Sequence, residues 1–212
     1  MHIIQQLEKD CLFAERVIVV DGDAQMRLRR YSEDNHQELE VELNKLVANG
    51  VIDRIVFCDD MQRSAIYRKY FRSTSDSAYS ANGQALLSSL VGFDSIETRY
   101  VFQTDSDILY YNQSDKGISQ ALYILKEQQA VTLSLSVCHS TTQPFSFGHR
   151  TEVRSSFIDL QELRSLLPLK NPIIRGIFSL PWHRVLDEKL NKEKSIRLQQ
   201  SELFFIHPEN VL

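Results

Sequence analysis

The segment with the clearest potential for chemistry is the acidic triplet Asp105, Ser106 and Asp107. It follows an apolar, β-favouring run from Arg99 to Gln103, and a second apolar run begins at Ile108. Carboxylates held between buried segments need a counter-charge or several hydrogen-bond donors. Carboxylate oxygens at positions i and i+2 can converge on one hard cation, Mn²⁺ or Mg²⁺, which in turn bridges phosphate oxygens. The alternative is a solvated Asx-type turn.

Other acidic residues also follow predicted strands. The β-branched run at 17–20 ends in Asp21, Gly22 and Asp23, and the run at 52–58 is followed by Asp59 and Asp60. Ligands of parallel α/β sheets bind outside the carboxyl ends of the strands. We therefore expect the acids to gather at one rim, where they repel one another unless a cation, a basic loop or a ligand's donors lie among them.

Helical and strand-like patterns alternate along the chain. Apolar residues at helical spacing predict helices within 3–11, 39–47, 86–90, 118–125, 160–167 and 182–190. Apolar or β-branched runs predict strands near 17–20, 52–58, 99–103, 131–137 and 203–206, with a short strand at 157. This alternation predicts an α/β fold with a mostly parallel central sheet flanked by helices.

Two local patterns add detail to this prediction. Thr132, Ser134 and Ser136 alternate with apolar residues, which is typical of a strand with one face in water. Asp159 and Glu162 have the spacing of a helix N-terminal cap. We find no internal repeat or linker that would mark a domain boundary, so we interpret the chain as a single domain.

The composition of the 212 residues is that of an ordinary folded protein, with 42% hydrophobic residues and a net charge of −4. This charge gives no reason to expect nucleic acid as a partner. Cys11, Cys58 and Cys138 are too far apart for a zinc knuckle or disulfide framework and indicate reduced thiols in the cytoplasm. No apolar run is long enough for a membrane span, while attachment at the inner face of the membrane stays open.

Two further segments contain candidate functional residues. His183 and Asp187 are four apart on a predicted helix, where either could be a general base, or where both could belong to an ordinary surface helix. The neighbouring Trp182 could stack on a sugar, but its spacing favours core packing. The segment 61–72, MQRSAIYRKYFR, could bind an anionic acceptor, a diphosphate-linked lipid head or an acidic membrane surface, or could be a solvated helix flank.

Several of these motifs together resemble the nucleotide-sugar glycosyltransferases of the GT-A fold, and most closely glycosyltransferase family 2. The similar segments are VIVVDGD at 17–23, SANGQA at 80–85, YVFQTDSD at 100–107 and the tail IHPEN. The resemblance implies a nucleotide-binding half at 1–110 and an acceptor-side half at 111–212. It also implies roles for individual residues: base recognition by Asp21 and Asp23, phosphate or nucleotide contacts by Asn82, Gln84 and Asp105, metal binding by Asp105, Asp107 and His207, and acceptor deprotonation by Asp187 or His183.

By this resemblance, the activity is Mn²⁺- or Mg²⁺-dependent transfer of a sugar from a nucleotide-diphosphate donor to a saccharide or lipid-linked acceptor, with inversion. The chain departs from the family at its start, because it opens in what corresponds to the second element and the usual first strand is predicted to be absent. A catalytically degenerate GT-A-like domain for binding or assembly is therefore an alternative. A second alternative is a haloacid-dehalogenase-like phosphatase, although in that class Asp-x-Asp lies near the N-terminus.

Overall fold

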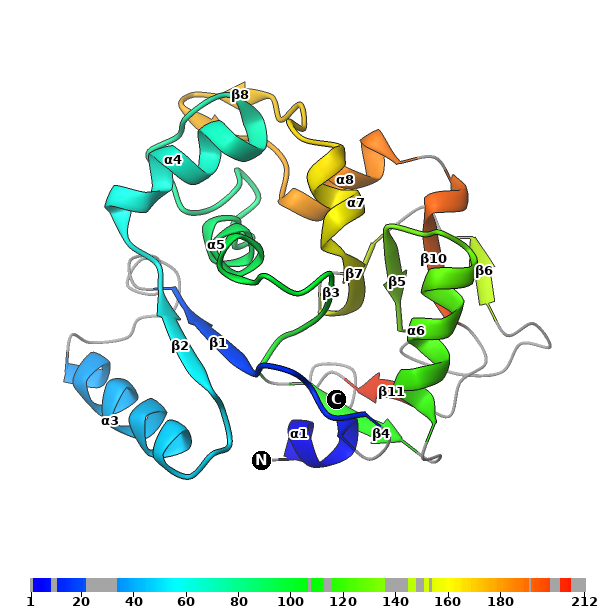
Figure 1. The fold of residues 1–212 in the computed structure, drawn as a ribbon. Coiled ribbons are helices and arrows are strands. Elements are labelled where there is room, and N and C mark those ends of the chain that lie inside the picture. Colours follow the sequence, from blue (N-terminus) through cyan, green and yellow to red (C-terminus); the bar gives the residue numbers. More distant parts are fainter. Residues whose placement is uncertain are drawn as a thin grey trace. The chain divides into compact units, whose positions relative to one another are not determined.

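A computed structural model describes most of the chain: residues 2–8, 11–21, 34–106, 108–112, 116–135, 145–147, 151–152, 154–190, 192–198 and 203–206. The chain forms two compact units (Figure 1). The β1 unit comprises residues 14–97 and 167–185, and the β3 unit comprises residues 1–13, 98–166 and 186–212. The predicted nucleotide-binding and acceptor-side halves stay a prediction, because each unit takes segments from both.

The β1 unit is built on a parallel pair of strands. Strand β1 (Val17–Val20) pairs in register with β2 (Arg54–Phe57), and the connection between them contains helix α3 (Asp34–Ala48). Parallel neighbours need such a crossover. Helix α3 ends at Ala48, two residues before Gly50, which has φ +65°, a left-handed conformation that glycine adopts without strain. The predicted strand, helix and strand of this part are confirmed.

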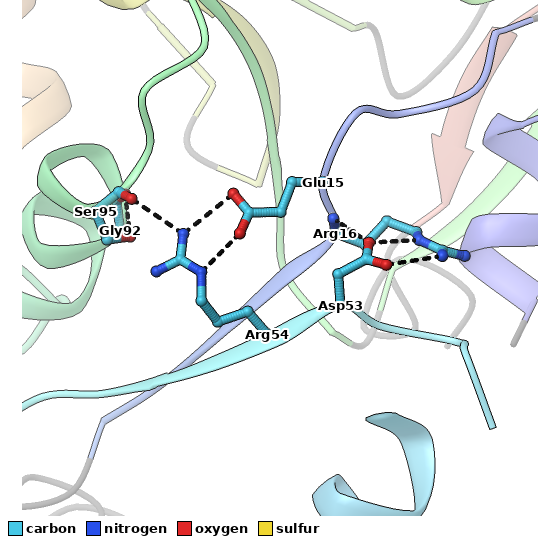
Figure 2. Close-up of polar contacts among 6 residues, drawn as sticks. All are labelled: Glu15, Arg16, Asp53, Arg54, Gly92 and Ser95. Atoms are coloured by element: carbon cyan, nitrogen blue, oxygen red, sulfur yellow. Dashed lines mark hydrogen bonds and ion pairs between the residues drawn. The ribbon is translucent and has the colours of Figure 1, made fainter. Parts of the chain in front are cut away.

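Two bidentate ion pairs fix the beginning of these strands (Figure 2). The backbone N–H and the guanidinium of Arg16 donate to Asp53 at 2.7–3.2 Å, and the guanidinium of Arg54 donates to Glu15 at 2.6 and 3.1 Å. Arg54 also donates to the Ser95 carbonyl at the end of a helix, at 3.0 Å. These hydrogen bonds hold the pKa values of Asp53 and Glu15 below their ordinary range. Because the pairs are partly exposed, they orient the strand ends more than they stabilise the fold.

The rest of the β1 unit packs around aromatic side chains. Its other elements are α4 (Asp60–Phe71), α5 (Leu87–Ser95) and a hairpin of β8 (Ile173–Ile174) and β9 (Ile177–Phe178). Phe178 is buried against Tyr67 and Phe71 with ring centroids 4.9 and 4.8 Å apart. Trp182 is also buried and meets Phe93 edge-on at 4.9 Å, so the prediction that it packs in the core is confirmed.

The β3 unit is built on a mixed sheet with the order β3-β7-β5-β10-β6. Its strands are β3 (Tyr100–Thr104), β7 (Ser155–Asp159), β5 (Thr132–Ser134), β10 (Ser195–Leu198) and β6 (Phe145–Phe147). Only β5 and β10 pair in parallel among these described strands. The α/β class is thus confirmed, but the expected predominance of parallel pairing is not. Strand β7 runs antiparallel to both of its neighbours, β3 and β5.

Helices and a second strand pair complete the β3 unit. They are α1 (His2–Leu7), α6 (Gly117–Glu127), α7 (Leu160–Ser165), the short 3₁₀ helix η1 (Lys192–Lys194), and the antiparallel pair β4 (Leu109–Asn112) and β11 (Leu203–Ile206). Helix α6 lies against the sheet and buries Ile118, Ala121 and Leu125 (Figure 1). The predicted cap of α7 is confirmed, because Asp159 accepts hydrogen bonds from two backbone N–H groups of the first turn. Helix α8 (Trp182–Lys189) begins in the β1 unit and ends in the β3 unit.

One expectation about the sheet is wrong. The hydroxyl side of β5 is not in water, because Thr132 and Ser134 are fully buried. The Thr132 hydroxyl lies 3.1 Å from the hydroxyls of both Thr151 and Ser195, and the Ser134 hydroxyl lies 3.1 Å from that of Ser156. Other elements of the β3 unit therefore supply the partners that water was expected to supply.

Candidate functional site

The acidic residue that follows β1 is in contact with a residue from a distant part of the sequence. Asp21 comes directly after the buried Val20, and its Oδ2 accepts a hydrogen bond from the hydroxyl of Tyr79 at 3.0 Å. Burial raises the pKa of the nearby Cys58 thiol to about 12, and the negative charge of Asp21 adds to this effect. The end of β1 thus presents a carboxylate beside a protonated thiol.

The turn after Tyr79 contains two of the predicted nucleotide-binding residues. The Ser80 hydroxyl lies 2.5 Å from Oδ1 of Asn82 and 3.1 Å from the carbonyl oxygen of Gln84. Gly83, between them, has φ +79°, which closes the turn without the strain that a side chain would cause. Asn82 and Gln84 are both exposed, so their amide groups can reach a ligand. Since Tyr79 binds Asp21, the structure brings this turn to the carboxyl end of β1.

The acidic triplet begins where β3 ends, as predicted. The backbone N–H of Asp105 donates to the carbonyl of Arg154 at 3.2 Å, and the hydroxyl of Thr104 donates to the Asp105 carbonyl at 3.0 Å. Tyr110 holds Thr104 in turn, with its hydroxyl 2.7 Å from Oγ1. Burial raises the pKa of Tyr110, and the negative charge of Asp105 contributes to the increase. These contacts fix the backbone of Asp105, while its side chain is only half-buried.

The predicted metal ligands are described in part. Asp105 lies within the described residues, whereas Asp107, His207 and the base-recognition candidate Asp23 lie outside them. Among the residues that the structure describes, no three His, Cys, Asp or Glu side chains gather to hold a metal ion. The half-buried carboxylate of Asp105 at a strand end fits a ligand of a hard cation, and two carboxylates with one imidazole suit Mn²⁺ or Mg²⁺.

Asp187, one of the two candidate bases, fixes a buried hydroxyl. Its Oδ1 accepts hydrogen bonds from the backbone N–H and the hydroxyl of Thr151, both at 2.8 Å. The same Thr151 hydroxyl lies 3.1 Å from that of Thr132 in β5, so Asp187 ties α8 to the hydroxyl side of the sheet. The Asp187 side chain remains half-buried. It therefore has a structural role in addition to any chemical one.

His183, the other candidate base, lies in a different environment. Its side chain is only 3% exposed, and its Nδ1 is buried with no hydrogen-bond partner in the described part of the chain. Burial and the positive charge of Arg184 lower the pKa of His183 from 6.5 to about 4. The hydrogen bonds of Oδ1 of Asp187 are with Thr151 and not with His183.

The predicted residues thus fall into two groups. Among the described ones, Asp21, Asn82, Gln84 and His183 belong to the β1 unit, and Asp105 and Asp187 belong to the β3 unit.

Sequence reasoning missed three neighbours of these groups. Tyr79 binds Asp21, Thr151 is held by Asp187, and Arg154 accepts from Asp105. Only Tyr79 had a signal in the sequence, because it stands directly before the SANGQA motif.

One of the two acids after β2 caps a helix. Asp59 is the N-cap of α4 and accepts from the backbone N–H of Met61 at 2.8 Å. This is the role expected of an aspartate before a helix. One carboxylate oxygen of Asp59 is therefore engaged by the helix.

Comparison with known proteins adds no assignment. None of the helices in the described ranges combines the length and apolar character needed to cross a bilayer. No family model, curated protein or solved structure matches this chain.

Proposed function

We propose that this protein is a metal-dependent glycosyltransferase that moves a sugar from a nucleotide-diphosphate donor to an acceptor hydroxyl, with inversion. The observation that carries the proposal is the hydrogen bond between Tyr79 and Asp21, 58 positions apart in the chain. It brings together two of the segments that resemble family 2 enzymes, the acidic end of β1 and the SANGQA turn. Motifs that were matched separately in the sequence are thus neighbours in the fold.

The residues divide the work of donor binding. The carboxylate of Asp21 accepts hydrogen bonds from the nucleotide base, and the exposed amides of Asn82 and Gln84 donate to ribose or phosphate oxygens. Asp105, with Asp107 and His207, would hold Mn²⁺ or Mg²⁺. When bound, such an ion screens the negative charge of the diphosphate leaving group.

Asp187 is the better of the two candidate bases. It is half-buried, whereas His183 is only 3% exposed and its Nδ1 is buried, so an acceptor hydroxyl can reach Asp187 more readily. A single displacement, in which Asp187 takes the proton of the attacking hydroxyl, inverts the configuration at the sugar carbon. Oδ1 binds Thr151, which orients the carboxylate for this step.

Thermal shift with a panel of UDP-, GDP- and dTDP-sugars tests the donor site. We expect at least one donor to raise the melting temperature with Mn²⁺ and not with EDTA. Asp105→Asn should remove this response, and the same substitution at the exposed Asp76 should not. A panel with no Mn²⁺-dependent shift would contradict the proposal.

Two substitutions separate the proposed role of Asp187 as general base from its structural role. Asp187→Asn keeps an oxygen that accepts from Thr151 but cannot take a proton at neutral pH, whereas Thr151→Val keeps the carboxylate and removes one hydrogen bond. We expect Asp187→Asn to abolish release of the nucleoside diphosphate while donor binding persists. Thr151→Val should reduce release only partly. Full activity of Asp187→Asn would exclude Asp187 as the base.

The engagement of both candidate bases also favours a second function, which is donor binding without transfer. Asp187 is hydrogen-bonded to Thr151 and His183 is buried, so neither side chain is freely accessible to an acceptor hydroxyl. In that case the wild-type protein binds a nucleotide sugar but releases no nucleoside diphosphate with any acceptor supplied.

A further inference from the structure

The hairpin β8–β9 ends in exposed aliphatic side chains. Ile173 and Ile174 are 41% and 58% exposed, whereas Phe178 on the facing strand is fully buried. Arg175 and Gly176 form the turn, with φ values of +52° and +81°, as in the tight turns typical of two-residue hairpins. Isoleucine is usually buried in folded proteins, so two adjacent exposed isoleucines beside a turn indicate a surface that binds a partner.

The hairpin is held rigidly by the rest of the β1 unit. Phe178 packs against the aromatic rings of α4, and the Ser75 hydroxyl donates to the carbonyl of Gly176 at 2.9 Å. At its base, the side chain of Asn171 bonds both the N–H and the carbonyl of Leu180, at 3.1 and 2.7 Å. The isoleucines are therefore presented on a fixed support, which lowers the entropy lost on binding.

Cationic side chains lie on the two segments that meet at the base of this hairpin. Leu169 donates its N–H to the carbonyl of Tyr70 at 2.7 Å, which places the start of the 170–178 segment beside the last turn of α4 (Figure 1). Besides Lys69, the exposed cations of these two segments are Arg68, Arg72, Lys170 and Arg175. Within the described residues, none of the four has an ion-pair partner, unlike Lys69, which pairs with Asp94.

We propose that the hairpin tip and these four cations, together called the hairpin patch, bind the surface of an anionic lipid bilayer. The charges of the patch complement acidic headgroups, which attract each nearby lysine or arginine. Aliphatic side chains at the tip enter the boundary between headgroups and acyl chains. The loop at 72–77 between α4 and the hairpin contains one carboxylate, Asp76, so the patch stays positive although the whole chain has a net charge of −4.

Flotation of the complete chain with vesicles tests this proposal. We expect binding to vesicles of equal parts phosphatidylcholine and phosphatidylserine, and little binding to phosphatidylcholine alone. The double variant Ile173→Ser, Ile174→Ser should weaken binding at least about tenfold, because two isoleucines that become partly buried in the bilayer are lost. Lys170→Glu with Arg175→Glu should weaken it by more than about tenfold, since each lost cation is worth about fivefold.

Matched controls separate the patch from general surface effects. Val41→Ser changes an aliphatic residue of α3 that is 53% exposed, and Lys189→Glu reverses an exposed charge on α8. Both should leave vesicle binding unchanged. Absence of binding to anionic vesicles, equal binding to neutral ones, or equal loss in the controls would overturn the proposal. So would a wild-type dimer in sedimentation velocity that the isoleucine variant abolishes without any vesicle binding.

A fluorescence measurement gives an independent test if a serine variant fails to fold. Trp182 is the only tryptophan and is 1% exposed, so Ile174→Trp adds a reporter at the tip. Brominated lipids in anionic vesicles should quench Ile174→Trp strongly and leave wild type and Val41→Trp unaffected. Equal quenching of all three proteins would contradict insertion of the tip. Neither test requires transferase activity.

Discussion

Replacing His183 with phenylalanine should flatten the pH dependence of stability on the acidic side of neutrality. Burial lowers the pKa of His183 to about 4, whereas the unfolded chain titrates near the ordinary value of 6.5. Below pH 6.5 the unfolded chain therefore binds a proton that the folded chain does not, and stability falls as the pH falls toward 4. Below pH 4 both states are protonated and this contribution becomes constant.

The size of the effect follows from the two pKa values. Each pH unit between them is worth about 1.4 kcal/mol, so His183 accounts for about 3 kcal/mol over the whole interval. Between pH 7 and pH 5, before most carboxylates titrate, its share is about 2 kcal/mol. Phenylalanine preserves the ring against Trp182, whose centroid lies 5.9 Å from that of His183, and does not titrate.

The assay is urea unfolding at pH 5, 6 and 7, followed by the fluorescence of Trp182. We expect the free energy of unfolding of wild type to fall by about 2 kcal/mol more than that of His183→Phe between pH 7 and 5. Direct titration of the imidazole by NMR is the control for the assignment. Equal pH dependence in both proteins, or an imidazole pKa at or above 6.5, would refute the reasoning and restore His183 as a candidate base.

Three other substitutions test separate contacts. Tyr79→Phe removes the hydrogen bond to Asp21 and should lower the free energy of unfolding by about 1–2 kcal/mol and weaken nucleotide binding in calorimetry; unchanged affinity would show that Asp21 does not need this support. Asp159→Ala removes the cap of α7 and should cost about 1–2 kcal/mol in urea unfolding, while Asp159→Asn should cost less because asparagine also caps. Phe178→Ala removes the aromatic contact with α4 and should lower the free energy of unfolding by about 3–5 kcal/mol. A decrease below about 1 kcal/mol would show that the hairpin does not belong to the core.

Local patterns predicted local structure well in this chain. The β-branched run at 17–20, the periodic segment of α3 and the cap at Asp159 all became the elements that their chemistry favours. Such features depend on residues close together in sequence, so they can be identified without knowledge of the tertiary fold. The placement of Asp21 and Asp105 directly after strands was predictable for the same reason.

The errors arose where distant segments decide the outcome. The alternation around Thr132 and Ser134 looks the same whether their hydroxyls face water or the hydroxyls of Thr151 and Ser156. Strand direction was misjudged because it depends on which distant strands become neighbours, as when β7 pairs antiparallel with both β3 and β5. The two-residue strand β8 was missed because so few residues give no detectable period, and β10 was missed although it is as long as β1.

The two candidate bases show the same limit. Their spacing of four on a helix predicted a shared flank, and both do lie on α8. Their surroundings come from other elements, which bury His183 and supply Thr151 to Asp187. Sequence spacing can therefore identify two candidate residues, but their burial and their partners from distant elements determine whether each can act as a base.

Isothermal titration of the complete chain with UDP, GDP and dTDP, in Mn²⁺ and in EDTA, tests the central claim most directly. The proposed transferase should bind at least one of these nucleotides with Mn²⁺ and lose that binding in EDTA or on Asp105→Asn, but not on Asp76→Asn. If no nucleoside diphosphate binds in the presence of Mn²⁺, or if binding is indifferent to both the metal and Asp105, the account is contradicted.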